Sequence, residues 1–160
     1  MYTRTYARWL PSQGRRERWE ETVDRYVSFI AEERGKLVPP KVLRKIQEGV
    51  LGMRVMPSMR LLWAAGDAAR ADNVTAYNCA FAEIDAINSF SECLYILMCG
   101  SGYGFSVTAE SVGKLPVVPT LTGESLGTYT VEDSRAGWAE SVKQLMTALY
   151  AGKDIDVNYS

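Results

Sequence analysis

The sequence predicts an α/β fold in which a helical N-terminal unit precedes alternating strands and helices. Two amphipathic helical patterns fill most of residues 12–54. Beyond them, one predicted helix lies between two apolar strand-like segments, and another lies ahead of a strand-like segment at residues 155–159. We therefore divide the chain into an N-terminal arm and helical unit, residues 1–54, and an α/β part, residues 55–160. A chain of 160 residues is long enough to enclose a hydrophobic core.

The helical unit is defined by apolar residues that recur at helical spacing. Residues 2–10 are aromatic and basic, and we expect an extended arm that Gly14 ends. A helix is expected over Arg15–Arg34, with Gly35 after its last turn. The Pro39-Pro40 pair then begins a second helix. The apolar positions are Trp19, Val23, Tyr26, Val27 and Ile30 in the first helix, and Val42, Leu43, Ile46, Val50 and Leu51 in the second.

The middle of the chain is expected to hold two strands. After a turn at Pro57-Ser58, the first strand is expected over Met59–Trp63, and a small polar loop over Gly66–Asn73. The apolar and aromatic run Tyr77–Phe81 predicts a second, buried strand. This strand carries a single thiol, that of Cys79.

A helix is expected to follow this strand, from Ser89 through Met98. Its first residues, Ser89-Phe90-Ser91-Glu92, fit a capping box. Three glycines within residues 100–104 come after this helix and before a strand over Tyr103–Ala109, the reverse of the order in a dinucleotide-binding fingerprint. The glycines either let the backbone approach a ligand closely or simply end the helix and turn the chain.

The last part of the chain predicts one more helix and strand. Residues 113–130 are expected to form loops and a short edge strand. Glu132-Asp133-Ser134 supplies the N-cap of a helix that extends to about Tyr150. Gly152 ends this helix, and a strand begins at Ile155. Because the segment stops within a strand–helix–strand pattern, we expect that more chain follows.

Composition excludes several classes of site. The chain has no histidine, so neither a histidine-based catalytic triad nor a histidine-containing zinc site can form within it. The three cysteines, Cys79, Cys93 and Cys99, form no C-x-x-C pair, so no metal site and no thioredoxin chemistry is indicated.

Charge and hydropathy limit the partners. The net charge of −1 argues against bulk binding of nucleic acid. Residues 1–54 carry about +5, which fits a solvated helical face better than a phosphate-binding patch. No apolar run reaches the roughly 20 residues of a membrane span, and the N-terminus lacks the pattern of a secretory signal. We expect a cytoplasmic protein whose thiols are reduced at rest.

Three residues leave a choice between chemistry and structure. Cys79 could be a nucleophile, a redox thiol or a packing residue; a nucleophile needs an adjacent base, and a redox thiol needs a partner, for which Cys93 and Cys99 are poor candidates. Ser58 either binds a phosphate or hydroxyl of a ligand or caps a turn. Asp85 either binds part of a nucleotide or is a solvated loop carboxylate.

Five stretches, taken in this order and at these spacings, resemble the N-terminal part of an adenosylcobalamin-dependent (class II) ribonucleotide reductase. Thr3–Trp9 resembles the arm that opens many of these enzymes, and Met56–Gly66 resembles their substrate-phosphate strand. Tyr77–Cys79 resembles the strand with the first reducing cysteine, and Gly100–Val107 the glycine-rich turn beside the substrate. Glu132–Ser141 is similar to the start of a family helix.

The resemblance implies roles for five residues. Cys79 would be catalytic, as one member of the cysteine pair that reduces the ribonucleotide and becomes a disulfide. Ser58, Asn78 and the backbone of Gly102 would bind the substrate. Asp85 would lie where the site of a deoxynucleoside triphosphate (dNTP) effector begins.

The resemblance also implies an architecture and partners. Residues 55–160 would be the first part of an α/β barrel of about ten strands, incomplete in this chain. In the family, adenosylcobalamin generates a thiyl radical that takes the 3′ hydrogen of the ribonucleotide. Because the thiyl cysteine and the second reducing cysteine lie further along, a C-terminal remainder would bind most of the cofactor, and the fragment alone would be inactive.

A thioredoxin-type protein would be the reductant, and ribonucleoside triphosphates the substrates. Two alternatives stay open. One is a non-catalytic nucleotide-binding or assembly module in which Cys79 only packs, and the other is a fragment of a class I large subunit.

Overall fold

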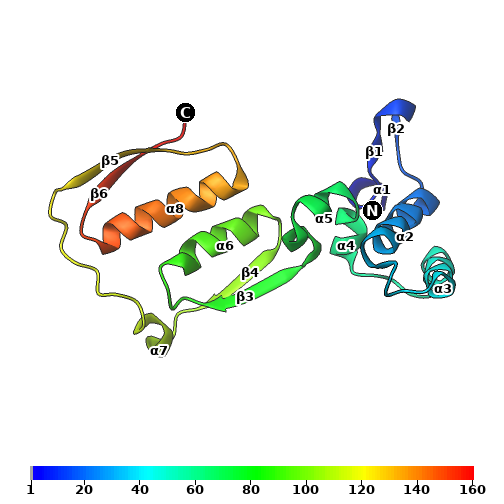
Figure 1. Cartoon of the computed structure of the whole chain (residues 1–160), viewed down its shortest axis with the longest axis horizontal. Helices are drawn as coiled ribbons and strands as arrows, with labels where there is room; N and C mark the ends of the chain where they lie inside the picture. Colours follow the sequence, from blue (N-terminus) through cyan, green and yellow to red (C-terminus); the bar gives the residue numbers. More distant parts are fainter. Residues whose placement is uncertain (1) are drawn as a thin grey trace. The chain divides into compact units, whose positions relative to one another are not determined.

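Two structural units make up the computed structural model, which describes residues 2–160 (Figure 1). The first unit ends at Tyr77 and the second comprises Asn78–Ser160. This boundary falls later than residue 54 because three short helical segments after Met59 pack within the first unit. The domain boundary that we expect between residues 54 and 55 remains a prediction. The structure shows a mixed α/β chain, as expected.

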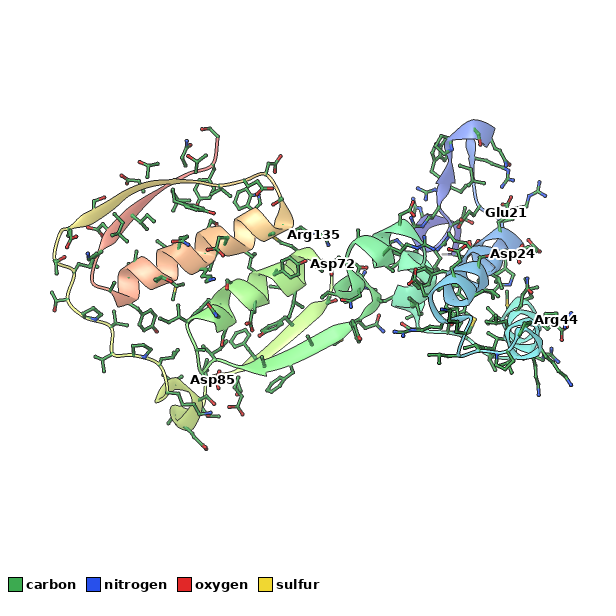
Figure 2. All side chains as sticks on the ribbon, in the orientation of Figure 1. Glu21, Asp24, Arg44, Asp72, Asp85 and Arg135 are labelled. Carbon is green, nitrogen blue, oxygen red and sulfur yellow. The ribbon has the colours of Figure 1, made fainter. Side chains whose placement is uncertain are left out.

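The first unit is mainly helical. Helices α2 (Trp19–Arg34) and α3 (Pro40–Leu51) pack against each other and confirm the two predicted helices. Across them, Gln47 Nε2 donates a hydrogen bond of 2.7 Å to Asp24 Oδ1, on the residue labelled in Figure 2. The other elements of this unit are α1 (Tyr2–Thr5), β1 (Trp9–Leu10), η1 (Pro11–Gln13), β2 (Arg15–Arg16), α4 (Met59–Ala64), α5 (Asp67–Ala71) and η2 (Asn73–Ala76).

Three local expectations in this unit are wrong. The arm over residues 2–10 begins as a helical turn, α1, and only its end is extended, where β1 pairs with β2 around Gly14. The strand expected over Met59–Trp63 is helix α4, because Ser58 caps it and Leu62 and Ala64 turn to the core. The loop expected over residues 66–73 contains α5.

An ion pair buried in the first unit joins its segments. Arg25 on α2 donates to Glu17 from Nε at 2.8 Å, and the Glu17 side chain is only 5% exposed. Arg25 Nη1 also donates to the carbonyl of Ala65 at 2.8 Å, just past the end of α4. The backbone N–H of Arg8 and the hydroxyl of Thr22 donate to Glu17 Oε2 at 3.0 and 2.8 Å. The N-terminal arm, α2 and the end of α4 are therefore all bonded to this ion pair.

The surroundings of Glu17 change its protonation. Burial alone would raise the pKa of the Glu17 carboxyl, but the hydrogen bonds from Arg25, Arg8 and Thr22 outweigh burial, and the pKa is lowered. A carboxyl whose pKa is lower in the folded than in the unfolded chain stabilises the fold above the unfolded-state pKa. That contribution is lost as the pH falls through the folded-state pKa.

The second unit is built from two strand–helix–strand motifs. Strands β3 (Cys79–Glu83) and β4 (Gly102–Ser106) pair in parallel, and helix α6 (Asn88–Met98) connects them. Strands β5 (Ser125–Thr130) and β6 (Asp154–Asn158) also pair in parallel and are connected by α8 (Arg135–Tyr150). The short helix α7 (Ala109–Val112) follows β4. Figure 1 shows α6 and α8 side by side between the two strand pairs, and the two helices contact each other.

The ends of the helices in the second unit test the capping predictions. Ser134 is the N-cap of α8 and accepts a hydrogen bond of 3.0 Å from the N–H of Gly137, as predicted. The capping box at Ser89 is wrong, because α6 begins one residue earlier and the Ser89 hydroxyl instead donates to the Glu83 carbonyl at 3.4 Å. That bond joins the start of α6 to the end of β3.

We predict that Glu17→Gln destabilises the chain at pH 7 by about 3 kcal/mol, because the positive charge of Arg25 stays buried without its counter-charge. The difference from the wild type should shrink as the pH falls and protonates Glu17. Urea unfolding at several pH values measures both effects. The control is Glu124→Gln, which removes an exposed carboxylate paired with Lys153 at 2.7 Å and should change stability far less. Equal losses in the two variants would contradict the prediction.

Candidate functional site

The predicted redox thiol lies on an open face of the β3–β4 pair. Cys79 is directly opposite Gly102, and the N–H of Gly102 donates a hydrogen bond of 2.8 Å to the carbonyl of Asn78. A Cβ added at Gly102 would lie 3.8 Å from Cys79 Sγ. The missing side chain at residue 102 therefore leaves the space beside the thiol clear.

The same open face continues along the strands. Phe81 lies two residues after Cys79 and is 69% exposed, and a Cβ added at the opposite residue, Gly104, would be 3.4 Å from its ring. The other face of the pair meets α6: burial, together with the neighbouring Cys93, raises the pKa of the Tyr103 hydroxyl. A thiol, an aromatic ring and two bare stretches of backbone thus share one uncovered surface.

The expectation that Cys79 is buried is wrong. The strand itself is confirmed, but Cys79 is exposed because α6 covers only one face of the β3–β4 pair. Exposure removes the argument that this thiol merely fills a core. The thiol is small, accessible and next to the exposed side chain of Asn78. The side-chain amide of Asn78 has no hydrogen-bond partner among the described residues.

The other two thiols have different surroundings. Cys93 is half-buried on α6, and burial raises the pKa of its thiol. Cys99, just after α6, is 4% exposed, and its sulfur accepts a hydrogen bond of 3.3 Å from Nη1 of Arg135 (Figure 2). None of the three cysteines forms a disulfide with another.

Ser58 belongs to the first unit. Its hydroxyl oxygen accepts a hydrogen bond of 3.4 Å from the N–H of Leu61 and caps α4, so the turn-capping interpretation is correct. The O–H remains able to donate to a ligand. Ser58 also lines a pocket of about 750 Å³, in which Arg34 brings a positive charge, whereas Arg70 is paired with Glu33 at 3.0 Å. Capping and ligand binding are therefore compatible for this serine.

Asp85 lies just beyond β3 beside α7 (Figure 2). Lys114 Nζ is 3.5 Å from Asp85 Oδ2 and 3.9 Å from Glu83 Oε2. The buried hydroxyl of Ser111 donates to the same Glu83 oxygen at 2.8 Å. These contacts hold two carboxylates and one cation at the end of the strand, rather than leaving Asp85 as a lone solvated carboxylate.

Sequence reasoning missed Lys114 and the pair formed by Phe81 and Gly104. Lys114 stands alone in a segment rich in glycine, proline and valine, and nothing in its spacing links it to Asp85. Phe81 could have been found, since residues two apart in a strand share a face and Cys79 was already placed on that strand.

Two classes of feature are absent from residues 2–160. No three side chains of His, Cys, Asp or Glu gather closely enough to hold a metal ion among these residues. Within the same range, every helix is too short or too polar to span a bilayer.

We predict that Gly102→Val slows alkylation of Cys79 by a bulky maleimide about tenfold, because the new side chain fills the space beside the sulfur. Valine is favoured in strands, so the fold should persist. Peptide mass spectrometry after timed labelling measures the rate at each cysteine separately. Gly104→Val is the matched control, because its side chain meets Phe81 instead. Unchanged labelling in Gly102→Val, or equal slowing in both variants, would contradict this geometry.

Comparison with known proteins gives a consistent family. Residues 1–67 match the model of the ribonucleotide reductase alpha domain. The chain is 31% identical over 173 residues to an adenosylcobalamin-dependent ribonucleoside-triphosphate reductase of Levilactobacillus brevis, which aligns with 88% of this chain. Proteins of the same name from Lacticaseibacillus paracasei and Euglena gracilis are 32% and 28% identical, over 89% and 100% of this chain.

The matched relatives are much longer than this chain. The chain spans 23% of the length of the two bacterial proteins and 24% of the protein from Euglena gracilis. A crystal structure of a B-12 dependent (class II) ribonucleotide reductase superposes on 99% of this chain and 31% of its own, with a TM-score of 0.79 and 24% identity. That likeness shows that the two share a fold.

Proposed function

We propose that this chain, which belongs to the ribonucleotide reductase family, supplies one reducing thiol and part of the substrate site of an adenosylcobalamin-dependent ribonucleoside-triphosphate reductase. The observation that carries the proposal is the exposed, reduced thiol of Cys79 beside the bare backbone of Gly102. The names of the relatives support both the reaction and the triphosphate substrate. The chain alone, at about a quarter of their length, would be inactive.

The reaction assigned to Cys79 is one half of a two-electron reduction. A ribonucleotide and two thiols give a deoxyribonucleotide, a disulfide and water. The oxygen of the 2′ hydroxyl becomes the oxygen of that water. Cys79 forms one side of the disulfide, and a cysteine in the remainder of the protein forms the other. A thioredoxin-type protein then restores the two thiols by disulfide exchange.

Three further residues are assigned to the substrate. The amide of Asn78, exposed and adjacent to Cys79, would bond to a polar group of the nucleotide. Gly102 would let the nucleoside lie against the backbone of β4. Ser58 would donate its O–H to a phosphate or ribose oxygen, and Arg34 in the same pocket would favour an anion.

The remainder of the enzyme completes the fold and the cofactor site. The strand pairs β3–β4 and β5–β6 each consist of two strands in the described chain, and isolated two-stranded sheets are marginal in water. We assign them to an α/β barrel of about ten strands, with residues 55–160 as its first part and residues 1–54 as the preceding arm and helical unit. Adenosylcobalamin, which supplies the radical when bound, would be held mainly by the remainder, while this chain contributes an accessible thiol to the reaction.

Regulation is assigned to the far end of β3. Asp85 would bind the ribose or base of a dNTP effector, and Lys114, 3.5 Å away, would hold its carboxylate in place. The cytoplasm, where thiols remain reduced, is the compartment that suits three free cysteines.

We predict that Cys79→Ser lowers turnover of a ribonucleoside triphosphate by about two orders of magnitude or more, because a hydroxyl cannot form the disulfide. The assay uses the chain assembled with the remainder of the reductase, adenosylcobalamin and a thioredoxin-type reductant. Cys93→Ser is the matched control and should keep wild-type turnover, because Cys93 lies on α6 away from the open face of the strand pair.

The same assay separates the alternatives. Turnover in Cys79→Ser equal to that of the wild type would contradict the catalytic assignment. Nucleotide binding without any turnover in the assembled wild type would instead favour a non-catalytic module. Turnover that needs a separate radical-generating subunit and no cobalamin would favour class I.

A further inference from the structure

Helix α3 of the first unit carries a small apolar groove that the proposed function does not use. Its walls are the side chains of Val42 and Ile46 on α3 and of Val55 beyond it, with Gly49 between them. Its volume is about 380 Å³, enough for one or two apolar side chains. Lys45 and Arg54 complete the lining.

The groove is built by the way in which α3 ends. The N–H groups of Arg54 and Val55 both donate to the carbonyl of Gly49, at 2.9 and 3.3 Å. The N–H of Met53 donates to the carbonyl of Val50 at 3.0 Å. This Schellman-type turn folds the chain back over the last turn of the helix. A Cβ at Gly49 would lie 3.0 Å from Val55 Cγ2, so the glycine makes room for the returning chain.

Met53 holds an unfavourable backbone conformation in this turn. Its φ is +53°, a left-handed value that glycine adopts at this position in most helix ends. Its side chain is 71% exposed, so it gains little from packing within the first unit. Met53 does not line the groove itself, but it directly precedes Arg54 and Val55, which do.

The charged side chains around the groove are mostly basic. Five basic side chains and one acidic side chain, that of Glu48, lie between residues 36 and 54. All five bases are exposed, and none forms an ion pair among residues 2–160. They are Lys36, Lys41, Arg44, which Figure 2 labels on α3, Lys45 and Arg54. The groove therefore has an apolar floor and a basic rim.

We propose that the α3 groove binds an acidic amphipathic segment of a partner protein. Apolar side chains of the segment enter the groove, a further one covers the exposed Met53 beside it, and the carboxylates of the segment pair with Lys45 and Arg54. A nucleic acid or a free phosphate would bind the basic side chains of the rim but would leave the apolar floor of the groove empty. A membrane would require a convex apolar face, whereas this one is concave. The proposal does not depend on the reductase activity.

Fluorescence anisotropy with a labelled helical peptide of about 15 residues tests this proposal. The peptide carries leucines at i, i+3, i+4 and i+7 and glutamates elsewhere, and we expect a Kd on the order of 10 µM. The double variant Lys45→Glu with Arg54→Glu should weaken binding at least about tenfold, since both rim charges become repulsive. Arg4→Glu, at an exposed base on α1, is the control for a charge reversal outside the groove and should leave the Kd within about twofold.

A second variant separates binding from folding. Met53→Gly should raise the unfolding midpoint, because glycine relieves the left-handed strain, and yet weaken peptide binding. A destabilised Met53→Gly, or one that binds as well as the wild type, would count against a functional role for this methionine.

Several results would overturn the proposal. One is the absence of peptide binding to the wild-type chain, and another is equally tight binding of a polyglutamate peptide without leucines. Binding of anionic lipid vesicles but not of the peptide would assign the surface to a membrane. Binding that disappears when the chain is assembled with the rest of the reductase would assign the groove to that remainder.

Discussion

The parallel pairing of β3 with β4 is the constraint on which the candidate site depends. Its register sets Cys79 opposite Gly102 and Phe81 opposite Gly104, so glycine backbone flanks each side chain. Helix α6 connects the strands and covers the opposite face, where Tyr103 lies. A slip of one residue would turn Cys79 toward α6 and close the site. The thiol is accessible because of this register and not because of any loop.

The elements that the sequence predicts well are those with long, regular patterns. Helices α2, α3 and α8 each bury one stripe, and glycine, proline or serine marks their ends. Helix α4 was mistaken for a strand because a six-residue apolar run has no clear period, and only the cap by Ser58 distinguishes it. The Cys79 strand was found because aromatic residues and turn signals surround it.

What the sequence could not supply depends on contacts between distant segments. The exposure of Cys79 follows from which face α6 covers, and a single strand pattern does not contain that information. The Glu17–Arg25 pair joins the residue before the N-cap of α2 to the middle of the helix, and Arg8 and Ala65 bond to it from distant segments. Lys114 reaches Asp85 across 29 residues. The roles of Ser58, Asn78 and Gly102 come from resemblance and chemistry, and they remain proposals.

The most direct test of the account is a single turnover of the assembled, prereduced reductase without external reductant, followed by peptide mapping of its disulfides. The account predicts that a disulfide between Cys79 and a cysteine outside this chain forms in the same amount as the deoxyribonucleotide. Cys93 and Cys99 should remain free thiols. Formation of the deoxyribonucleotide while Cys79 remains a free thiol would contradict the central claim.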